Sequence, residues 1–320
     1  MARLATFVDG EIDAATALAR GAGAASAPGD HDALLYGARL AGPGTLVLGR
    51  WQRRDPATPA LRRASGGPTA RIGDGVLYLA LGLRHRSSLM ACPPDRILNR
   101  NVRGLLAGLG ALAGEPVLHY GREWLSQRTT PIALVGWTED REGRVLLEAF
   151  VSSAPPAAPF APPRGPDAYR GHPPGSIACA RTTGEMIEAI ARAHGTRFGE
   201  VTIATAAAPP PETALPPDRA DVEVWSDPVA VPIGIVQAGV TVTEGHLAAA
   251  RVAGDFYAQE AAIAALEHAL VGLAPEPLEL GAVIDRALGP GRGVIEGLRS
   301  LAPIRDALLA AAREEPPRDA

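Results

Sequence analysis

The sequence predicts an α+β fold, with helices packed against a mixed β-sheet and a small second α+β domain after it. Strand-like and helix-like segments alternate through most of the chain, and a hairpin followed by helical runs occupies its last part. Proline-rich stretches at 154–174 and 209–217 interrupt this pattern, because proline disfavours both helix and central strand. We therefore expect a larger domain at 1–208 with 154–174 as a loop, a linker at 209–217, a C-terminal domain at 218–313 and a frayed tail at 314–320.

The larger domain contains short apolar runs and one clear amphipathic pattern. Residues 45–49 and 75–81 are apolar runs next to glycine, which is typical of buried strands. Leucine and valine recur at helical spacing over 95–113, so this segment is predicted to form a helix that ends at Gly114. Further strands are expected at 132–136, 144–151 and 201–204, and a helix is expected after Thr182 or Thr183.

The C-terminal segment begins with a strand pattern. Val236, Ala238 and Val240 alternate with less apolar residues, and Glu244-Gly245 then turns the chain, so 236–242 and 247–252 are predicted to form a hairpin. Helices are expected around Ile263, Leu266 and Leu270, over 278–288 and over 294–311, with 289–293 as a turn between two helices.

Composition excludes several classes of protein. A formal net charge of -4 and a pI near 6.0 argue against nonspecific nucleic-acid binding, which needs clustered cations. No run approaches the ~20 apolar residues of a membrane span. The N-terminus lacks the apolar core of a signal peptide, and two cysteines, Cys92 and Cys179, fit a reducing compartment, so we expect a cytoplasmic protein. No spacing of His, Cys and Asp predicts a metal site.

One motif carries a chemical prediction, Arg62-Arg63-Ala64-Ser65-Gly66-Gly67, which lies between two strand signals. Adjacent glycines let the backbone approach a ligand closely, and exposed N–H groups there would cradle a carboxylate or phosphate. The neighbouring arginines would pair with the same anion. The alternative is an ordinary Gly-Gly turn beside solvated arginines.

The order of several motifs resembles the lipoate–protein ligase family of the biotin/lipoate ligase superfamily. The resemblance covers nearly the whole chain, and the co-linear order is more specific than any one piece. It is carried by Gly49-Arg50-Trp51-Gln52, Arg62 to Gly67, Gly73-Asp74-Gly75, Tyr120 to Leu125, Leu134-Val135-Gly136 and Gly254-Asp255-Phe256.

This resemblance implies a class II synthetase-like biotin/lipoate ligase fold with a lipoate ligase C-terminal accessory domain. It also implies ATP and Mg²⁺ as cofactors, lipoate or octanoate as substrate, and a lysine of a lipoyl carrier domain as the acceptor of the acyl group. The residues that it implies for the acyl-adenylate site are Arg62, Arg63, Ser65, Gly66, Gly67, Asp74 and Gly136.

The sequence departs from the family at its catalytic lysine. It contains no lysine, so its 31 basic residues other than histidine are all arginine, and Ala133 stands at the family's lysine position. By analogy with oxyanion-hole donors, losing a positioned cation costs roughly 3–4 kcal/mol of transition-state stabilisation. Arg122, Arg128 and Arg144 are the candidate substitutes, although a planar guanidinium does not replace an ammonium directly.

Three functions therefore remain open from sequence. The first is an enzyme that makes or uses a lipoyl or octanoyl adenylate and transfers the acyl group to a lipoyl carrier domain. The second is a non-catalytic homologue that acts as a binding or partner module. The third is an enzyme of the same fold for another acyl group.

Overall fold

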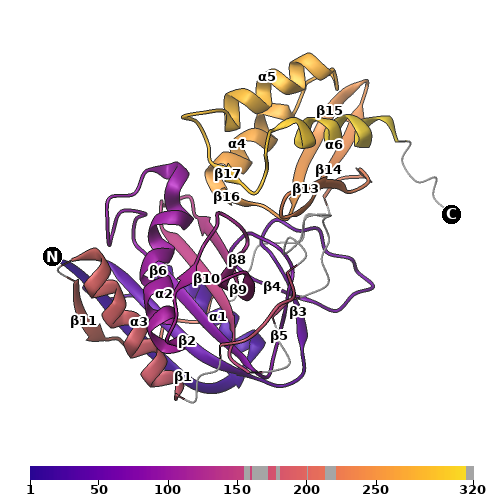
Figure 1. The fold of residues 1–320 in the computed structure, drawn as a ribbon. Coiled ribbons are helices and arrows are strands. Elements are labelled where there is room, and N and C mark those ends of the chain that lie inside the picture. The colour runs from indigo at the N-terminus through magenta and orange to yellow at the C-terminus, as the bar shows by residue number, and fades with distance from the viewer. Residues whose placement is uncertain (155–158, 161–171, 178–180, 200, 213–220, 315–320) are drawn as a thin grey trace.

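The computed structural model describes residues 1–154, 159–160, 172–177, 181–199, 201–212 and 221–314. Two bodies follow each other along the chain, a larger one built around a long sheet and a smaller one near the C-terminus (Figure 1). The mixed sheet and its packed helices confirm the predicted fold class.

Ten strands of the described residues form the main sheet, in the order β11-β1-β2-β6-β10-β9-β16-β17, with β7 and β8 attached beside β9. Pairing is parallel for β11–β1, β1–β2 and β9–β16, and antiparallel for the central strands. The strands are β1 Ala2–Asp13, β2 Ala33–Ala41, β6 Val76–Leu83, β7 Val117–Leu118, β8 Trp124–Gln127, β9 Thr130–Glu139, β10 Val145–Ser152, β11 Val201–Thr205, β16 Tyr257–Gln259 and β17 Ile295–Glu296.

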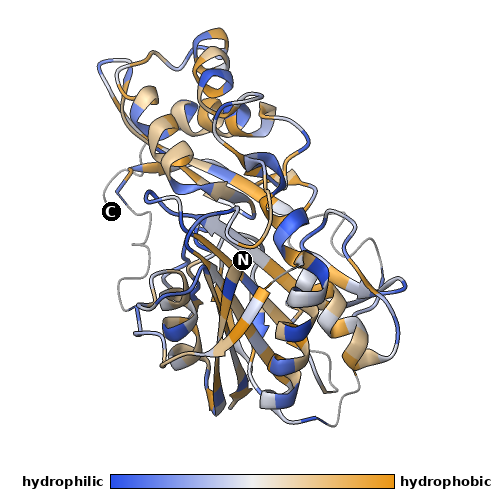
Figure 2. Cartoon of the chain, turned by 90° about the vertical axis from the view of Figure 1, so that its left-hand side faces the viewer, coloured by the Kyte–Doolittle hydropathy of each residue, from blue (hydrophilic) through white to orange (hydrophobic). Residues whose placement is uncertain are grey.

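Each face of this sheet has its own apolar core. Helices α2 (Ile97–Ala113, after the short helix η2, Pro94–Arg96) and α3 (Thr183–Phe198) contribute to the core on one face. Helix α1 (Ala14–Ala22), followed by the short helix η1 (Gly23–Ala25), contributes to the core on the other face together with a small sheet. Figure 2 shows the apolar residues gathered along the strands and polar ones alternating along the helices.

Glycines bring α2 and α3 unusually close together. A side-chain carbon at Gly104 would lie 2.3 Å from the ring of His194, and one at Gly108 would lie 2.6 Å from the backbone of Ile190. His194 is fully buried at this contact, where its Nδ1 lies 2.8 Å from the Ile190 carbonyl oxygen. Burial lowers the pKa of His194 from its ordinary value of 6.5 to about 4.

The small sheet on the second face has the order β4-β3-β5 and holds the arginine and glycine motif. Its strands are β3 Thr45–Leu48, β4 Leu61–Arg62 and β5 Ala70–Ile72. The motif begins in β4 and continues into the loop before β5, so the sheet fixes both ends of that loop.

The C-terminal body packs helices against a second sheet around a separate apolar core. That sheet contains β12 Val224–Trp225, β13 Val229–Val231, β14 Gly234–Thr243 and β15 His246–Gly254, and the helices are α4 Glu260–Leu270, α5 Pro277–Leu288 and α6 Ala302–Arg313. Strand β16 leaves this body and pairs in parallel with β9, so the main sheet continues into the C-terminal segment. The sequence patterns did not indicate this connection.

Most predicted elements are confirmed. Helix α2 ends at Gly114 with a left-handed φ of 72°, Thr182 caps α3 with a capping box, and β14 and β15 form the expected hairpin. The helix expected over 294–311 is wrong in its first part, because β17 pairs with β16 and Gly297 adopts a φ of 98°, so α6 begins only at Ala302. For the same reason, 289–293 connects a helix to a strand.

Several expectations lie partly or wholly outside the described residues. They concern most of the loop at 154–174, the end of the linker at 209–217, the tail at 314–320 and Cys179. Residues 2–41 form β1, α1 and β2, for which the sequence patterns gave no expectation. In the part of the chain that the structure covers, no helix has the length and apolar character needed to span a membrane.

We expect acid to destabilise the protein through His194. Because the folded state disfavours the protonated ring, the free energy of unfolding falls as the pH drops from about 6.5 to about 4, by about 3 kcal/mol for this group. Urea unfolding of His194→Gln at several pH values should show a shallower pH dependence. His246→Gln, at the exposed start of β15, is the control. Equal pH dependence in both variants would contradict the assignment.

Candidate functional site

The loop of the arginine and glycine motif lies against the edge of β9, between the two strands that pair with that edge. Strand β8 pairs with β9 up to Leu134, and β16 pairs from Thr138 onward. The N–H of Gly66 donates to the Trp137 carbonyl at 3.0 Å, in the interval between them. The loop is therefore fixed onto the main sheet.

We expected the N–H groups of this loop to be free for an anion, and in this structure they donate to the protein itself. The Ser65 N–H donates to Glu148 Oε2 at 2.9 Å, and the Gly67 N–H donates to the Phe256 carbonyl at 2.9 Å. The Gly66 N–H is used by Trp137, as described above. The N–H groups of Ser65, Gly66 and Gly67 are thus occupied by acceptors from β10, β9 and the C-terminal segment.

Arg62 has a structural role in the same loop. Its NH1 donates to the carbonyl oxygens of Gly49 at 3.1 Å, Arg50 at 3.2 Å and Gln52 at 2.7 Å. A guanidinium that binds several carbonyl oxygens fixes the shape of a turn. Arg62 thereby holds the segment 49–52 against β4.

Arg63 is fully buried and its guanidinium is only partly satisfied. Its NH2 donates to the Pro68 carbonyl at 2.9 Å, and the guanidinium lies over the ring of Phe150 at 5.3 Å. Nε and NH1 have no hydrogen-bond partner among the described residues. Burial lowers the pKa of Arg63, and the negative charge of Glu148 opposes this shift.

Gly136 provides the space that Arg63 and Ser65 occupy. A side-chain carbon at Gly136 would lie 2.6 Å from Arg63 NH1, 2.6 Å from Ser65 Oγ and 2.4 Å from the Gly66 carbonyl oxygen. Ser65 Oγ is buried and, like Arg63 NH1, has no partner in the part of the chain that the structure describes. Two unsatisfied donors therefore converge over one backbone position of β9.

Glu148 is the negatively charged residue that interacts with both Arg63 and Ser65. It is fully buried on β10, in register with Gly136, and accepts hydrogen bonds from the Ser65 N–H and from the Tyr78 hydroxyl. Burial and the Glu148 charge raise the pKa of Tyr78. We call the set Arg63, Ser65, Tyr78, Gly136, Glu148 and Phe150 the Arg63 cluster.

Sequence reasoning named Arg63, Ser65 and Gly136 but missed Glu148 and Tyr78. A signal for Glu148 was present, because it is the one acidic residue in the apolar run Val145–Ser152. A lone carboxylate in a strand buried on both faces has to meet a donor or a cation. Tyr78 carried no comparable signal, because tyrosine is common in strands.

Asp74 and Ala133 lie away from the Arg63 cluster. Asp74 is exposed, and its carboxylate accepts a hydrogen bond from the Gly42 N–H at 2.8 Å, so it stabilises a turn. Ala133 is fully buried in the apolar core on the face of α2 and α3, whereas Phe150 and Tyr78 belong to the core on the opposite face. Ala133, which we assigned from sequence to the position of the family lysine, therefore faces hydrocarbon.

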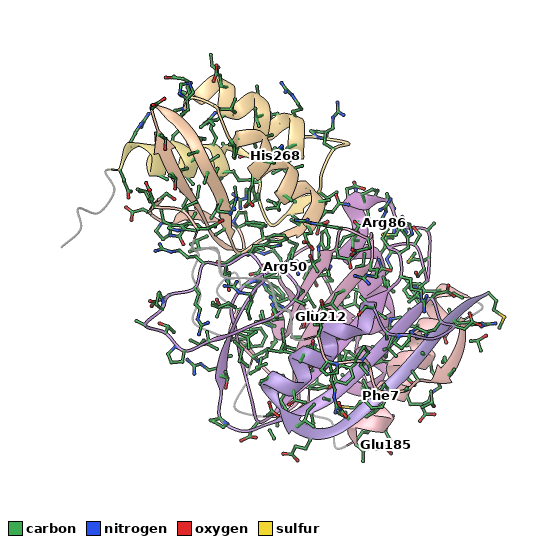
Figure 3. All side chains as sticks on the ribbon, turned by 180° about the vertical axis from the view of Figure 1, so that it is seen from behind. Phe7, Arg50, Arg86, Glu185, Glu212 and His268 are labelled. Atoms are coloured by element: carbon green, nitrogen blue, oxygen red, sulfur yellow. The ribbon has the colours of Figure 1, made fainter. Side chains whose placement is uncertain are left out.

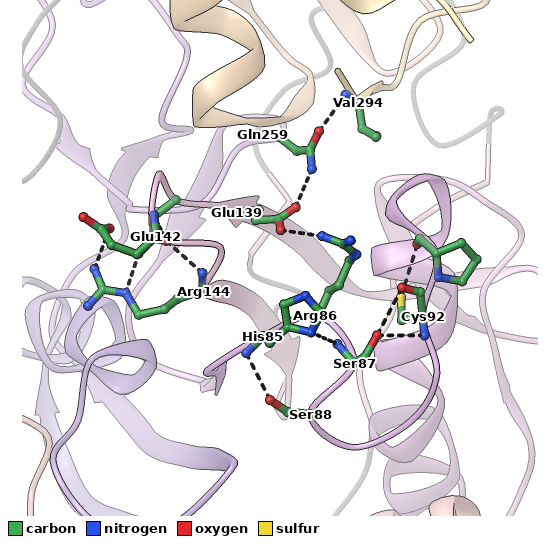
Figure 4. A network of polar contacts seen from close by, with 12 residues as sticks. His85, Arg86, Ser87, Ser88, Cys92, Glu139, Glu142, Arg144, Gln259 and Val294 are labelled. Carbon is green, nitrogen blue, oxygen red and sulfur yellow. Dashed lines mark hydrogen bonds and ion pairs between the residues drawn. The ribbon is translucent and has the colours of Figure 1, made fainter. Parts of the chain in front are cut away.

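The three arginines considered as substitutes for lysine are each engaged elsewhere. Arg122 pairs with Glu123 at 3.0 Å and donates to the Pro232 carbonyl at 2.7 Å. Arg128 is 85% exposed and pairs with Glu115. Arg144 pairs with Asp140 at 2.6 Å and Glu142 at 3.0 Å in the turn after β9 (Figure 4).

A polar cleft of about 230 Å³ adjoins the motif loop at Ala64. Its charged lining consists of Arg50 and Arg144 against the four carboxylates of Asp140, Glu142, Glu212 and Glu260. Figure 3 labels Arg50 and Glu212 on this side of the molecule, and Arg50 pairs with Glu260 at 2.8 Å. An acidic lining disfavours a triphosphate. The described residues also contain no cluster of His, Cys, Asp or Glu suited to a metal ion.

The C-terminal segment closes the motif loop from outside. Trp51 stacks on Phe256 at 6.0 Å, and the Gly254 N–H donates to the Trp51 carbonyl at 3.0 Å. The buried side chain of Gln52 donates to Asp255. The Gly-Asp-Phe motif at 254–256 thus binds the segment 49–52 directly, a contact between the two bodies that sequence alone did not predict.

We expect Arg63 and Glu148 to be energetically coupled. Arg63→Met leaves a buried carboxylate without its counter-charge, and Glu148→Gln does the same to the arginine, so each should cost roughly 3 kcal/mol of unfolding free energy. The double variant should cost less than the sum of the two changes. Denaturant unfolding of all four proteins measures this coupling, and strictly additive effects would contradict it.

No protein-family model matches the sequence, and no curated protein matches it. Solved structures do. LipL1 of P. falciparum, solved in complex with lipoate, is 8% identical with a TM-score of 0.63, and the match covers 96% of this chain and 99% of that one.

Two further solved structures align less closely. A bi-partite lipoate protein ligase from Thermoplasma acidophilum is 14% identical with a TM-score of 0.47, covering 64% of this chain and 87% of that one. A biotin protein ligase from Leishmania major, in complex with biotinyl-5-AMP, is 14% identical with a TM-score of 0.37, covering 78% and 95%. The match to LipL1 extends over almost all of both chains, and it confirms that this protein has the lipoate ligase-like fold that the sequence predicted.

Proposed function

We propose that this chain is a lipoate ligase-like protein that binds the carboxylate of a lipoyl- or octanoyl-type acyl group at the Arg63 cluster and does not convert it to an acyl adenylate. The carrying observation is the convergence of unsatisfied donors, Arg63 NH1 and Ser65 Oγ, over Gly136.

Unsatisfied buried donors favour an anionic ligand. A buried polar group without a partner costs roughly 1–3 kcal/mol, and more when it is charged. A carboxylate that accepts from Arg63 Nε or NH1 and from Ser65 Oγ removes this cost and adds charge-assisted hydrogen bonds. The binding energy would therefore come largely from Arg63 and Ser65 donors that have no partner among the described residues.

Adenylation needs groups that this site lacks. Ala133 supplies no cation, the N–H groups of Ser65, Gly66 and Gly67 are occupied, and the adjoining cleft presents four carboxylates to two arginines. The family resemblance implied ATP and Mg²⁺ as cofactors, and these residues do not fit them. The proposal therefore assigns the protein a binding role and derives no step through a nucleotide.

Calorimetric titration with octanoate and with lipoate tests the binding. The wild-type protein should bind, and Ser65→Ala should bind roughly fivefold more weakly because it loses about 1 kcal/mol of hydrogen bonding. Ser126→Ala is a matched control, since it deletes a hydroxyl on β8 that is equally buried and has no partner among the residues that the structure describes. Absence of binding, or equal weakening in both variants, would refute the site.

A ligation assay tests the second half of the proposal. Wild-type protein incubated with ATP, Mg²⁺, lipoate and an apo lipoyl carrier domain should leave the mass of that domain unchanged. A mass increase equal to one lipoyl group would show that the protein is a ligase and would refute the binding-only role.

Restoring lysine at the family position should not create a ligase. Ala133→Lys places an ammonium among apolar side chains, so we expect a loss of several kcal/mol in unfolding stability and no ligation. Thermal unfolding and the same mass assay measure both effects. Gain of ligation by Ala133→Lys would mean that this position faces the acyl group after all.

A further inference from the structure

A second cavity lies far along the chain from the Arg63 cluster, between η2 and the segment that follows α5. Its volume is about 630 Å³, and its walls are Pro94 and Asp95 on one side and residues 288–296 and 298–301 on the other. A cavity of this size suits a small organic molecule. Nothing in the proposed function uses it.

Hydrogen bonds fix the wall formed by the segment after α5. The Gly289 N–H donates to the Asp285 carbonyl at 2.8 Å, and the Gly293 N–H donates to the Ala287 carbonyl at 2.9 Å. The Val294 N–H donates to Gln259 Oε1 at 2.9 Å, and Gln259 donates in turn to Glu139 (Figure 4). The wall is thus tied to the end of β9, so the cavity is part of the folded structure.

Glu296 is the polar group of this cavity with an unused oxygen. Its Oε2 accepts a hydrogen bond from Trp137 Nε1 at 3.0 Å. No other hydrogen bond or ion pair of Glu296 exists among the described residues, so its second oxygen remains available. Pairing of β17 with β16 at Tyr257 and Ala258 holds the Glu296 backbone in place.

The rest of the lining is mainly apolar. Leu288 is buried, and Val294, Ile295, Leu298 and Leu301 are half-buried around the cavity. Such a lining favours an aliphatic group, because burial of apolar surface away from water is favourable.

Four other charged groups face this region. Asp95 and Arg96 lie on η2, where they pair with each other at 3.6 Å, and both act electrostatically on Glu296. Arg292 and Arg299 are exposed at the opposite wall. The half-buried carboxylate of Glu296 is therefore the anchor inside the cavity, and the other charges lie at its rim.

We propose that this cavity binds a primary amine with an apolar body, whose ammonium group donates to the free oxygen of Glu296 while the body packs on the leucine-rich wall. An ammonium supplies three donors and a positive charge, which match one unpaired carboxylate oxygen.

Titration of Glu296 gives the binding a pH dependence. Burial raises the pKa of Glu296 to about 7, the Trp137 hydrogen bond opposes that shift, and nearby Asp95 adds to it. The carboxylate that holds an ammonium is fully formed only above this pKa. Amine affinity should therefore rise about tenfold from pH 6 to pH 8, the ratio of ionised fractions for a pKa of about 7.

We test this proposal by titrating the full chain with hexylammonium and measuring binding by calorimetry and by tryptophan fluorescence. We expect saturable binding that strengthens about tenfold from pH 6 to pH 8 and a change in Trp137 emission that is absent in Trp137→Phe. Glu296→Gln keeps an acceptor for Trp137 but lacks the charge, and it should lose at least tenfold in affinity together with the pH dependence. Glu279→Gln, at an exposed position of α5, should bind as the wild type does.

The alternative outcomes are distinct. No binding of hexylammonium, or equal binding by the wild type and Glu296→Gln, would overturn the proposal. Tighter binding of hexanoate than of hexylammonium would do the same, because it would assign the cavity to an anion held by Arg292 or Arg299. Displacement of hexylammonium by hexanol at similar concentration would show that the site recognises only the apolar body, and it would also overturn the proposal. None of these results depends on acyl binding at the Arg63 cluster.

Discussion

Burial of the Arg63 guanidinium on the edge of the main sheet is the constraint on which the rest of the structure depends. A cation without solvent requires nearby negative charge, and Glu148 on β10 supplies it. Glu148 also accepts from the Ser65 N–H, so one carboxylate stabilises both the charge and the backbone of the loop. Because Gly136 has no side chain, the loop approaches β9 closely enough for these contacts.

The same loop links the two bodies of the protein. Its last N–H binds the Phe256 carbonyl, and the segment 49–52 that it supports binds residues 254–256. Strand β16 then extends the main sheet, and the turn before α6 builds the wall of the cavity at Glu296. Placement of the C-terminal body, closure of the loop and formation of the second cavity are consequences of one continuous set of backbone contacts.

This fold and a sequence without lysine are compatible in physical terms. The fold positions a loop next to a strand, and it does not require that the strand carry lysine. Here Ala133, the residue that we assigned to the lysine position, belongs to the apolar core beneath α2 and α3. Arg63 NH1 and Ser65 Oγ lie on the opposite face, where we propose that they recognise an acceptor oxygen.

Sequence by itself determined the α+β class, the end of α2 at a glycine, the cap of α3 and the hairpin of β14 and β15. These features depend on periodicity, capping and turn chemistry, which act between residues close together in the chain. It also named Arg63, Ser65 and Gly136 as candidate site residues, and the structure brings these three together. Only the tertiary structure decided that the loop N–H groups would be occupied, that Glu148 and Tyr78 would join Arg63, and that β16 would enter the main sheet. Those outcomes depend on pairing between residues distant in the chain, which no local pattern encodes.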